Sequence, residues 1–115
     1  MAYDPTDHRL FTGDRGPGKL VVLNSETGAV VATLPIGDTS DDMTYDADHH
    51  RIYISTADGL NIVGQDSPDT YRLLQHIDTL GGKTSIYIPS LKRFYVVHTK
   101  GDKAPEAGLQ IFAVR

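Results

Sequence analysis

Hydrophobic and polar residues alternate along most of this chain, in short runs that are separated by turn-forming residues. This alternation predicts half-buried β-strands, and no stretch keeps the i, i+3, i+4 spacing of a helix over three turns. In the run 29–36, for example, every second residue from Val30 to Ile36 is apolar. The predicted strands cover residues 10–12, 20–24, 29–36, 43–45, 51–56, 60–64, 71–77, 85–88, 93–99 and 109–114.

The strand pattern repeats with a period of 42 residues. Related turn-and-strand segments begin at Tyr3, Tyr45 and Tyr87, and an arginine stands six residues after each of these tyrosines. A period of about 40–45 residues with short strands is typical of the blades of a β-propeller. We therefore predict an all-β fold of four-stranded antiparallel blades. A β-sandwich also has closely spaced short strands, but the unbroken period argues against it.

The whole chain, residues 1–115, is predicted to form one partial propeller of about 2.7 blades. The first blade covers about residues 3–36, the second about 39–78, and the incomplete third about 83–115, which lacks an outer strand. Closed propellers have about four to eight blades, so this chain leaves two apolar blade faces exposed. We expect a homo-oligomer to complete the ring, with about six blades in a dimer or about eight in a trimer.

The chain resembles the bacterial YVTN-repeat propellers of the YncE-like type. The residues that carry this resemblance are KLVVLNSETGAVVATLPIGD (19–38), GDTSDDMTYDADHHRIYIST (37–56), LKRFYVV (91–97) and GLQIFAVR (108–115). Complete members of this family have about seven blades, so the resemblance is to the C-terminal blades only. It implies the propeller fold but no particular activity, because the family has no single agreed chemistry.

Composition and charge exclude several classes of function. The net charge is −4 and Lys and Arg form no cluster, so we do not expect a nucleic-acid partner. The chain has no cysteine, which excludes disulfides and thiolate metal sites. We find neither a signal peptide nor an apolar run that could span a membrane, so no membrane partner and a cytoplasmic location are expected. Complete family members, by contrast, are usually exported to the periplasm or the cell exterior.

A polar loop face is the predicted binding site. In a propeller, the loops between the second and third strands of each blade open on the same face as the crossings to the next blade. Ligands of such folds generally bind there, so we expect a small polar ligand or a protein partner. The candidate ligand-binding residues are Asp14, Arg15, Asp38, Asp41, Asp42, Asp58, Lys83, Thr84 and Lys100.

Metal, cofactor and nucleophile motifs are weak in this sequence. The carboxylates between Asp38 and Asp42 could bind a hard cation, but their spacing differs from that of an EF-hand, and capping of their own backbone is favoured. The five histidines lack the spacing of a metal site. GGKTS (81–85) resembles the end of a phosphate-binding loop, but a predicted strand follows it where a helix is needed. We predict no metal, cofactor or catalytic residue.

Three hypotheses about function follow. The favoured one is a non-enzymatic module that self-associates into a closed ring and binds a ligand or protein through its loop face. A second is a fragment of an extracytoplasmic propeller enzyme, a lyase or hydrolase with charged channel residues. A third is a self-assembling structural fragment with no ligand.

Two sets of residues recur once per blade and are predicted to be structural. The aromatic set should pack within or between blades, and the arginine set should pair with turn carboxylates or carbonyls. The aromatic residues are Tyr3, Phe11, Tyr45, Tyr53, Tyr87 and Tyr95, and the arginines are Arg9, Arg51 and Arg93.

Overall fold

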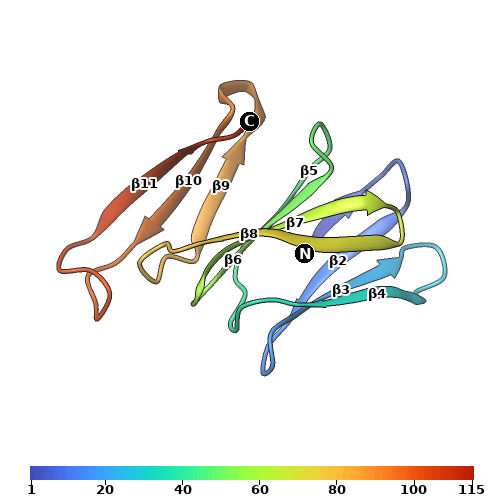
Figure 1. Cartoon of the computed structure of the whole chain (residues 1–115), viewed down its shortest axis with the longest axis horizontal. Helices are drawn as coiled ribbons and strands as arrows, with labels where there is room; N and C mark the ends of the chain where they lie inside the picture. The colour runs from blue at the N-terminus through green and yellow to red at the C-terminus, as the bar shows by residue number, and fades with distance from the viewer.

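The computed structural model describes all 115 residues, and it contains three antiparallel β-sheets that lie side by side (Figure 1). Strands that follow each other along the chain are neighbours in each sheet. The only helical segment is a single 3-10 turn, η1 (Pro89–Leu91). No helix has the length and apolar character needed to cross a membrane. The prediction of an all-β, antiparallel chain is therefore confirmed.

The first sheet has four strands in the order β1-β2-β3-β4. They are β1 (Ala2–Asp4), β2 (Arg9–Asp14), β3 (Lys19–Asn24) and β4 (Val30–Pro35). Side chains alternate between its two faces, as the period-2 pattern requires. One face packs on the second sheet, and the other is open to solvent.

The second sheet also has four strands, in the order β5-β6-β7-β8. They are β5 (Met43–Asp46), β6 (Arg51–Thr56), β7 (Gly59–Ser67) and β8 (Thr70–Ile77). β7 is longer than the predicted run 60–64, and its pairing with β8 shifts register twice. Ile62 and Val63 lie on opposite faces of the sheet, as alternation along a strand requires, so both faces of the second sheet are apolar and covered.

The third sheet has three strands, in the order β11-β10-β9. They are β9 (Thr84–Ile88), β10 (Arg93–His98) and β11 (Gly108–Ala113). β11 pairs with β10 along one edge and has no strand on its other edge. The predicted absence of an outer strand from the third repeat agrees with this order.

The 42-residue period is also visible in the backbone. His8, His50 and Lys92 occupy equivalent turns and have φ angles of 55°, 52° and 51°, in the left-handed region that non-glycine residues rarely adopt. The carbonyl of each accepts a hydrogen bond from the residue that follows the last pair between the second and third strands, from Ser25, Gln65 and Val114 respectively. The left-handed turn therefore ties the start of the second strand to the point where the third strand leaves that pairing in every sheet.

Two apolar clusters hold the three sheets together. The first junction, between the first and second sheets, buries Phe11, Leu20 and Val22 against Ile52, Ile54 and Val63. The second junction, between the second and third sheets, buries Tyr53 and Leu60 against Tyr87, Phe94 and Val96. The ring centroids of Phe11 and Tyr45 are 5.4 Å apart, and those of Tyr53 and Tyr87 are 5.3 Å apart. The predicted aromatic packing is confirmed for these four residues.

Candidate functional site

The loops at one end of the first two sheets contact one another through polar groups. The guanidinium of Arg15 donates two hydrogen bonds to the carbonyl of Ser40, the shorter of 2.9 Å. The Asp38 carboxylate accepts a 2.5 Å hydrogen bond from the backbone of Gly18, and the Asp38 backbone donates to Asp58 at 3.0 Å. These contacts join three separate loops, which carry five of the predicted site residues: Arg15, Asp38, Asp41, Asp42 and Asp58.

A small polar hollow lies among these loops. It has a volume of about 210 Å³, and its lining includes Thr12, Arg15, Ser40, Asp41 and Asp42. The structure therefore brings three predicted residues together around one space: one cation and two carboxylates. Such a lining can hydrogen-bond a small polar molecule.

Most of the predicted carboxylates also have a structural role. Asp38 and Asp58 form the loop contacts above, and Asp42 accepts a 2.8 Å hydrogen bond from the backbone of Ser85 in the third sheet. We expected such side chains to cap their own backbone, but these carboxylates accept from backbone groups of other loops or of another sheet. The structure contains no group of three His, Asp or Glu side chains placed to hold a metal ion.

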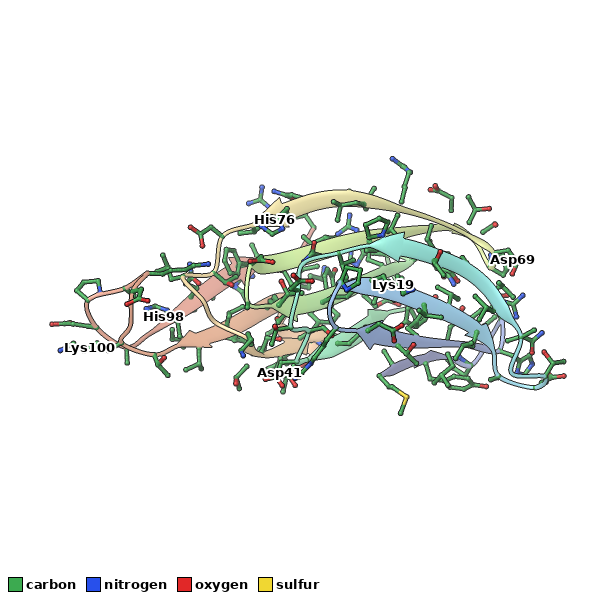
Figure 2. The ribbon with its side chains drawn as sticks, turned by 90° about the horizontal axis from the view of Figure 1, so that it is seen from below. Lys19, Asp41, Asp69, His76, His98 and Lys100 are labelled. Carbon is green, nitrogen blue, oxygen red and sulfur yellow. The ribbon has the colours of Figure 1, made fainter.

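Other predicted residues lie outside the hollow. Asp14 is exposed at the end of β2, and Lys83 and Thr84 stand at the start of β9 without lining this space. Lys100 belongs to the loop that follows β10, and Figure 2 shows it at the left tip of the molecule, away from Asp41. The nine predicted residues therefore do not form one site.

The open face of the third sheet carries a broad apolar surface. Tyr95 stands opposite Ile86 and Ile111 across the strands, and Val97 stands opposite Leu109. Leu109 and Ile111 are 54% and 59% exposed. In the first sheet the equivalent residues are Leu20 and Val22, which are buried at the first junction. This surface is therefore an apolar sheet face without a neighbouring sheet.

The open face of the first sheet is apolar as well. Tyr3 stands opposite Leu10 across the strands, and Leu10 stands opposite Leu23. Tyr3 is 44% exposed and Leu10 is half-buried, whereas the residues one and two periods beyond Leu10, Ile52 and Phe94, are buried at the two junctions. The two ends of the molecule thus expose the positions that its junctions cover.

The repeated arginines reach different partners. Arg9 contacts the next sheet, donating to the carbonyl of Pro68 at 3.2 Å and to the carboxylate of Asp69 at 2.7 Å. Arg51 donates to the carbonyl of Arg115 at 2.8 Å. Arg93 contacts only carbonyls of its own turn. Pairing with turn carboxylates or carbonyls is confirmed for Arg9 and Arg93, whereas Arg51 reaches the residue that ends the chain. The pairs of Arg9 and Arg51 cross a junction between sheets.

No protein-family model matches this chain, and neither a curated protein nor a solved structure does. The function must therefore be argued from the surfaces that the structure exposes.

Sequence reasoning missed a buried polar network in the first junction. The Asp4 carboxylate accepts hydrogen bonds from Gln65 of the second sheet and from two backbone N–H groups of its own turn, and Gln65 in turn accepts the hydroxyl of Tyr45 at 2.7 Å. Burial alone would raise the pKa of Asp4, but these hydrogen bonds outweigh it and hold the pKa below its ordinary value. Only the fold brings Gln65 to Asp4, so no spacing could have revealed the pair.

Proposed function

We propose that this protein is a non-enzymatic interaction module of the β-propeller class, whose copies join head to tail into a closed ring. Its three sheets would be blades, and the resemblance to YVTN-repeat propellers is consistent with this reading. The observation that carries the proposal is the exposure of apolar residues on the two open faces, at positions whose equivalents are buried between sheets. Large exposed apolar surfaces on soluble proteins normally mark interfaces.

The two existing junctions suggest how the copies would meet. Each junction stacks an aromatic residue of one sheet near a tyrosine of the next, Phe11 with Tyr45 and Tyr53 with Tyr87. The third pair in this series would be Tyr95 of one copy and Tyr3 of the next. The interface is heterologous, because two different faces meet, and it therefore forms a ring if the rotation between copies closes.

The arginine series supports the same joint. Arg9 and Arg51 each cross to the following sheet, whereas Arg93 has no following sheet within the chain. In the proposed joint, Arg93 would reach the turn 25–28 of the next copy. That turn contains Glu26, whose only ionic partner in the chain is the exposed His8 at 3.5 Å. A carboxylate is therefore available where Arg93 would arrive.

Ring closure would repeat the polar hollow beside Asp41 around the rim. Two copies would give about six blades and three about eight, both within the range of known propellers. The small polar ligand or protein partner expected at the loop face would bind at these repeated hollows.

Solution mass tests the proposal directly. Size exclusion with light scattering over a hundredfold concentration range should give a dimer or trimer for the unmodified chain. Ile111→Asp should give a monomer, because it places a charge in the proposed joint at a position that tolerates water in the free chain. Leu91→Asp is the matched control, since Leu91 is similarly exposed but lies in η1 outside the open faces. A monomeric unmodified chain at every concentration would refute self-association.

A further inference from the structure

A groove separates the outer part of the second sheet from the third sheet. It has a volume of about 420 Å³, and most of its lining is apolar. The second sheet contributes Leu60, Ile62 and Leu74, and the third sheet contributes Phe112 and Val114 from β11 and the residue after it. This groove is larger than the polar hollow and lies on a different part of the molecule from the two open faces.

The groove runs beside the unpaired edge of β11. In the first two sheets, the corresponding place is held by a fourth strand, β4 or β8, which pairs with the third strand. β4 and β8 also contact each other across the first junction. In the third sheet the backbone groups along the free edge of β11 have no such partner. The groove therefore lies where a fourth strand would pair with β11.

β8 shows which side chains such a strand would carry. Asp69, directly before β8, pairs with Arg9 of the first sheet, and Tyr71 packs edge-on against Phe11 with ring centroids 5.8 Å apart. The start of β8 is therefore fixed by two contacts with the first sheet. The carboxylate of Asp69 pairs with Arg9, and the ring of Tyr71 packs on Phe11 in the first junction. Arg51 is the equivalent of Arg9, and it lines the groove.

The charge of the groove fits an acidic entry residue. Arg51 and Arg115 are its only charged lining residues, and no Asp or Glu contributes to the lining. Arg51 now donates to the carbonyl of Arg115, so its guanidinium already points toward the end of β11. A carboxylate there would find two guanidinium groups within a mainly apolar lining, where charge-assisted hydrogen bonds are strong.

We propose that β11 and this groove form a binding site for an extended peptide segment of a partner protein. The segment adds to β11 as an antiparallel fourth strand, and its backbone satisfies the free edge. An acidic residue at its start pairs with Arg51, and apolar side chains at alternate positions fill the groove. The partner is thus recognised by the pattern of one carboxylate followed by alternating apolar residues.

The test uses a synthetic peptide with the sequence of residues 69–77, DTYRLLQHI, which fills the equivalent place in the second sheet. It begins with a carboxylate, and its apolar side chains are those of Tyr71, Leu73, Leu74 and Ile77. With a fluorescent label, its anisotropy should rise on titration with the protein and saturate at one peptide per chain. A peptide with Asn in place of the leading Asp should bind more weakly. Hydrogen exchange of the β11 backbone amides should slow when the peptide is bound.

Two neighbouring leucines of β8 give a matched pair of protein variants. Leu73 and Leu74 are 45% and 41% exposed, but only Leu74 lines the groove. Leu74→Asp should weaken peptide binding by about tenfold or more, which corresponds to about 1.4 kcal/mol. Leu73→Asp should leave it nearly unchanged. Equal effects of the two substitutions, or no saturable binding, would overturn the proposal.

The ring and the peptide site can be separated experimentally. The Ile111→Asp monomer keeps the residues that line the groove, so it should bind the peptide as the unmodified chain does. If the unmodified chain assembles but neither form binds the peptide, the ring stands and the peptide site is refuted. If the β11 amides are protected without peptide in the assembled chain and exchange freely in the Ile111→Asp monomer, a second copy covers the groove, and the assignment to a partner peptide is wrong.

Discussion

The two junctions between sheets share one apolar framework and differ in their polar contacts. Both place an aromatic residue of β2 or β6 against a tyrosine of the next sheet. Asp4 and Asp46 occupy equivalent buried positions, yet Asp4 accepts a hydrogen bond from Gln65 across the junction. Asp46 instead accepts from Tyr53 and His49 of its own sheet. The framework is therefore set by the repeat, and the polar contacts are specific to each junction.

This difference indicates which contacts are interchangeable between repeats. The buried aromatic residues follow the period, so a joint with another copy could reuse them. The polar network of Asp4 and Gln65 has no equivalent in the second junction, because Gln65 corresponds to Val114. The first junction should therefore depend on the ionisation of Asp4, and the second junction has no counterpart to that network.

The largest effect is expected from removing the apolar framework at the first junction. Phe11→Ala removes a fully buried ring that packs on Tyr45 and Tyr71, and it should lower the free energy of unfolding by about 3–5 kcal/mol. Tyr95→Ala is the period-equivalent control on the open face and should cost about 1 kcal/mol or less in the dilute monomer. Urea denaturation measures both. Similar losses for the two variants would show that the open face is not free of contacts.

A smaller effect is expected from Asp4→Asn, which tests the polar difference between the junctions. Replacing the charged acceptor should cost about 2 kcal/mol at pH 7, since hydrogen bonds to buried charged groups are strong. The folded-state pKa of Asp4 is lowered, so its contribution is present above the unfolded value of about 3.9 and is lost as pH falls through the folded value. The stability difference from the unmodified chain should therefore shrink in acid.

The control for this experiment is Asp48→Asn, in the exposed turn after β5. It should change the free energy of unfolding by about 0.5 kcal/mol or less at each pH, as surface substitutions usually do. A loss for Asp4→Asn that stayed constant from pH 7 to pH 3 would mean that the charge of Asp4 does not matter.

The sequence predicted the strands, because period-2 alternation and turn residues act over a few neighbouring positions. It also predicted that Tyr45 and Tyr87 have a packing role, since these residues recur with the period; the structure shows that both pack on aromatic rings. The candidate site was predicted only in part: Arg15, Asp41 and Asp42 line one hollow, but Lys100 lies elsewhere. Loop conformation decides where such exposed side chains lie, and the repeat does not determine it.

Contacts between distant segments could not be predicted. Gln65 follows Val63 on the face of β7 that packs on the first sheet, and it reaches Asp4 only because the fold places that face beside β1. The groove beside β11 could not be predicted for the same reason, because residues of the second and third sheets form it together. The apolar walls beside the free edge of β11 are visible only in the fold.

The smallest effect is expected at the left-handed turn. All three sheets share the positive φ of this turn, and a substitution at Lys92 changes it in the third sheet alone. Lys92→Gly should raise the free energy of unfolding by about 0.5 kcal/mol, because glycine adopts a positive φ without strain but loses more entropy on folding. Lys92→Val should lower it by about 1–2 kcal/mol, since a β-branched residue is disfavoured there. Lys100→Gly, in an exposed loop, is the control for the added glycine. Thermal unfolding measures all three.

These two substitutions test the turn because the carbonyl of Lys92 accepts a 3.0 Å hydrogen bond from Val114. Glycine can keep that carbonyl in place, so the hydrogen bond should survive and the amide of Val114 should stay protected from exchange. Valine would favour a negative φ, which turns the carbonyl away and frees the same amide. If Lys92→Val left both the stability and the protection of Val114 unchanged, the left-handed turn would have no part in holding the end of β11.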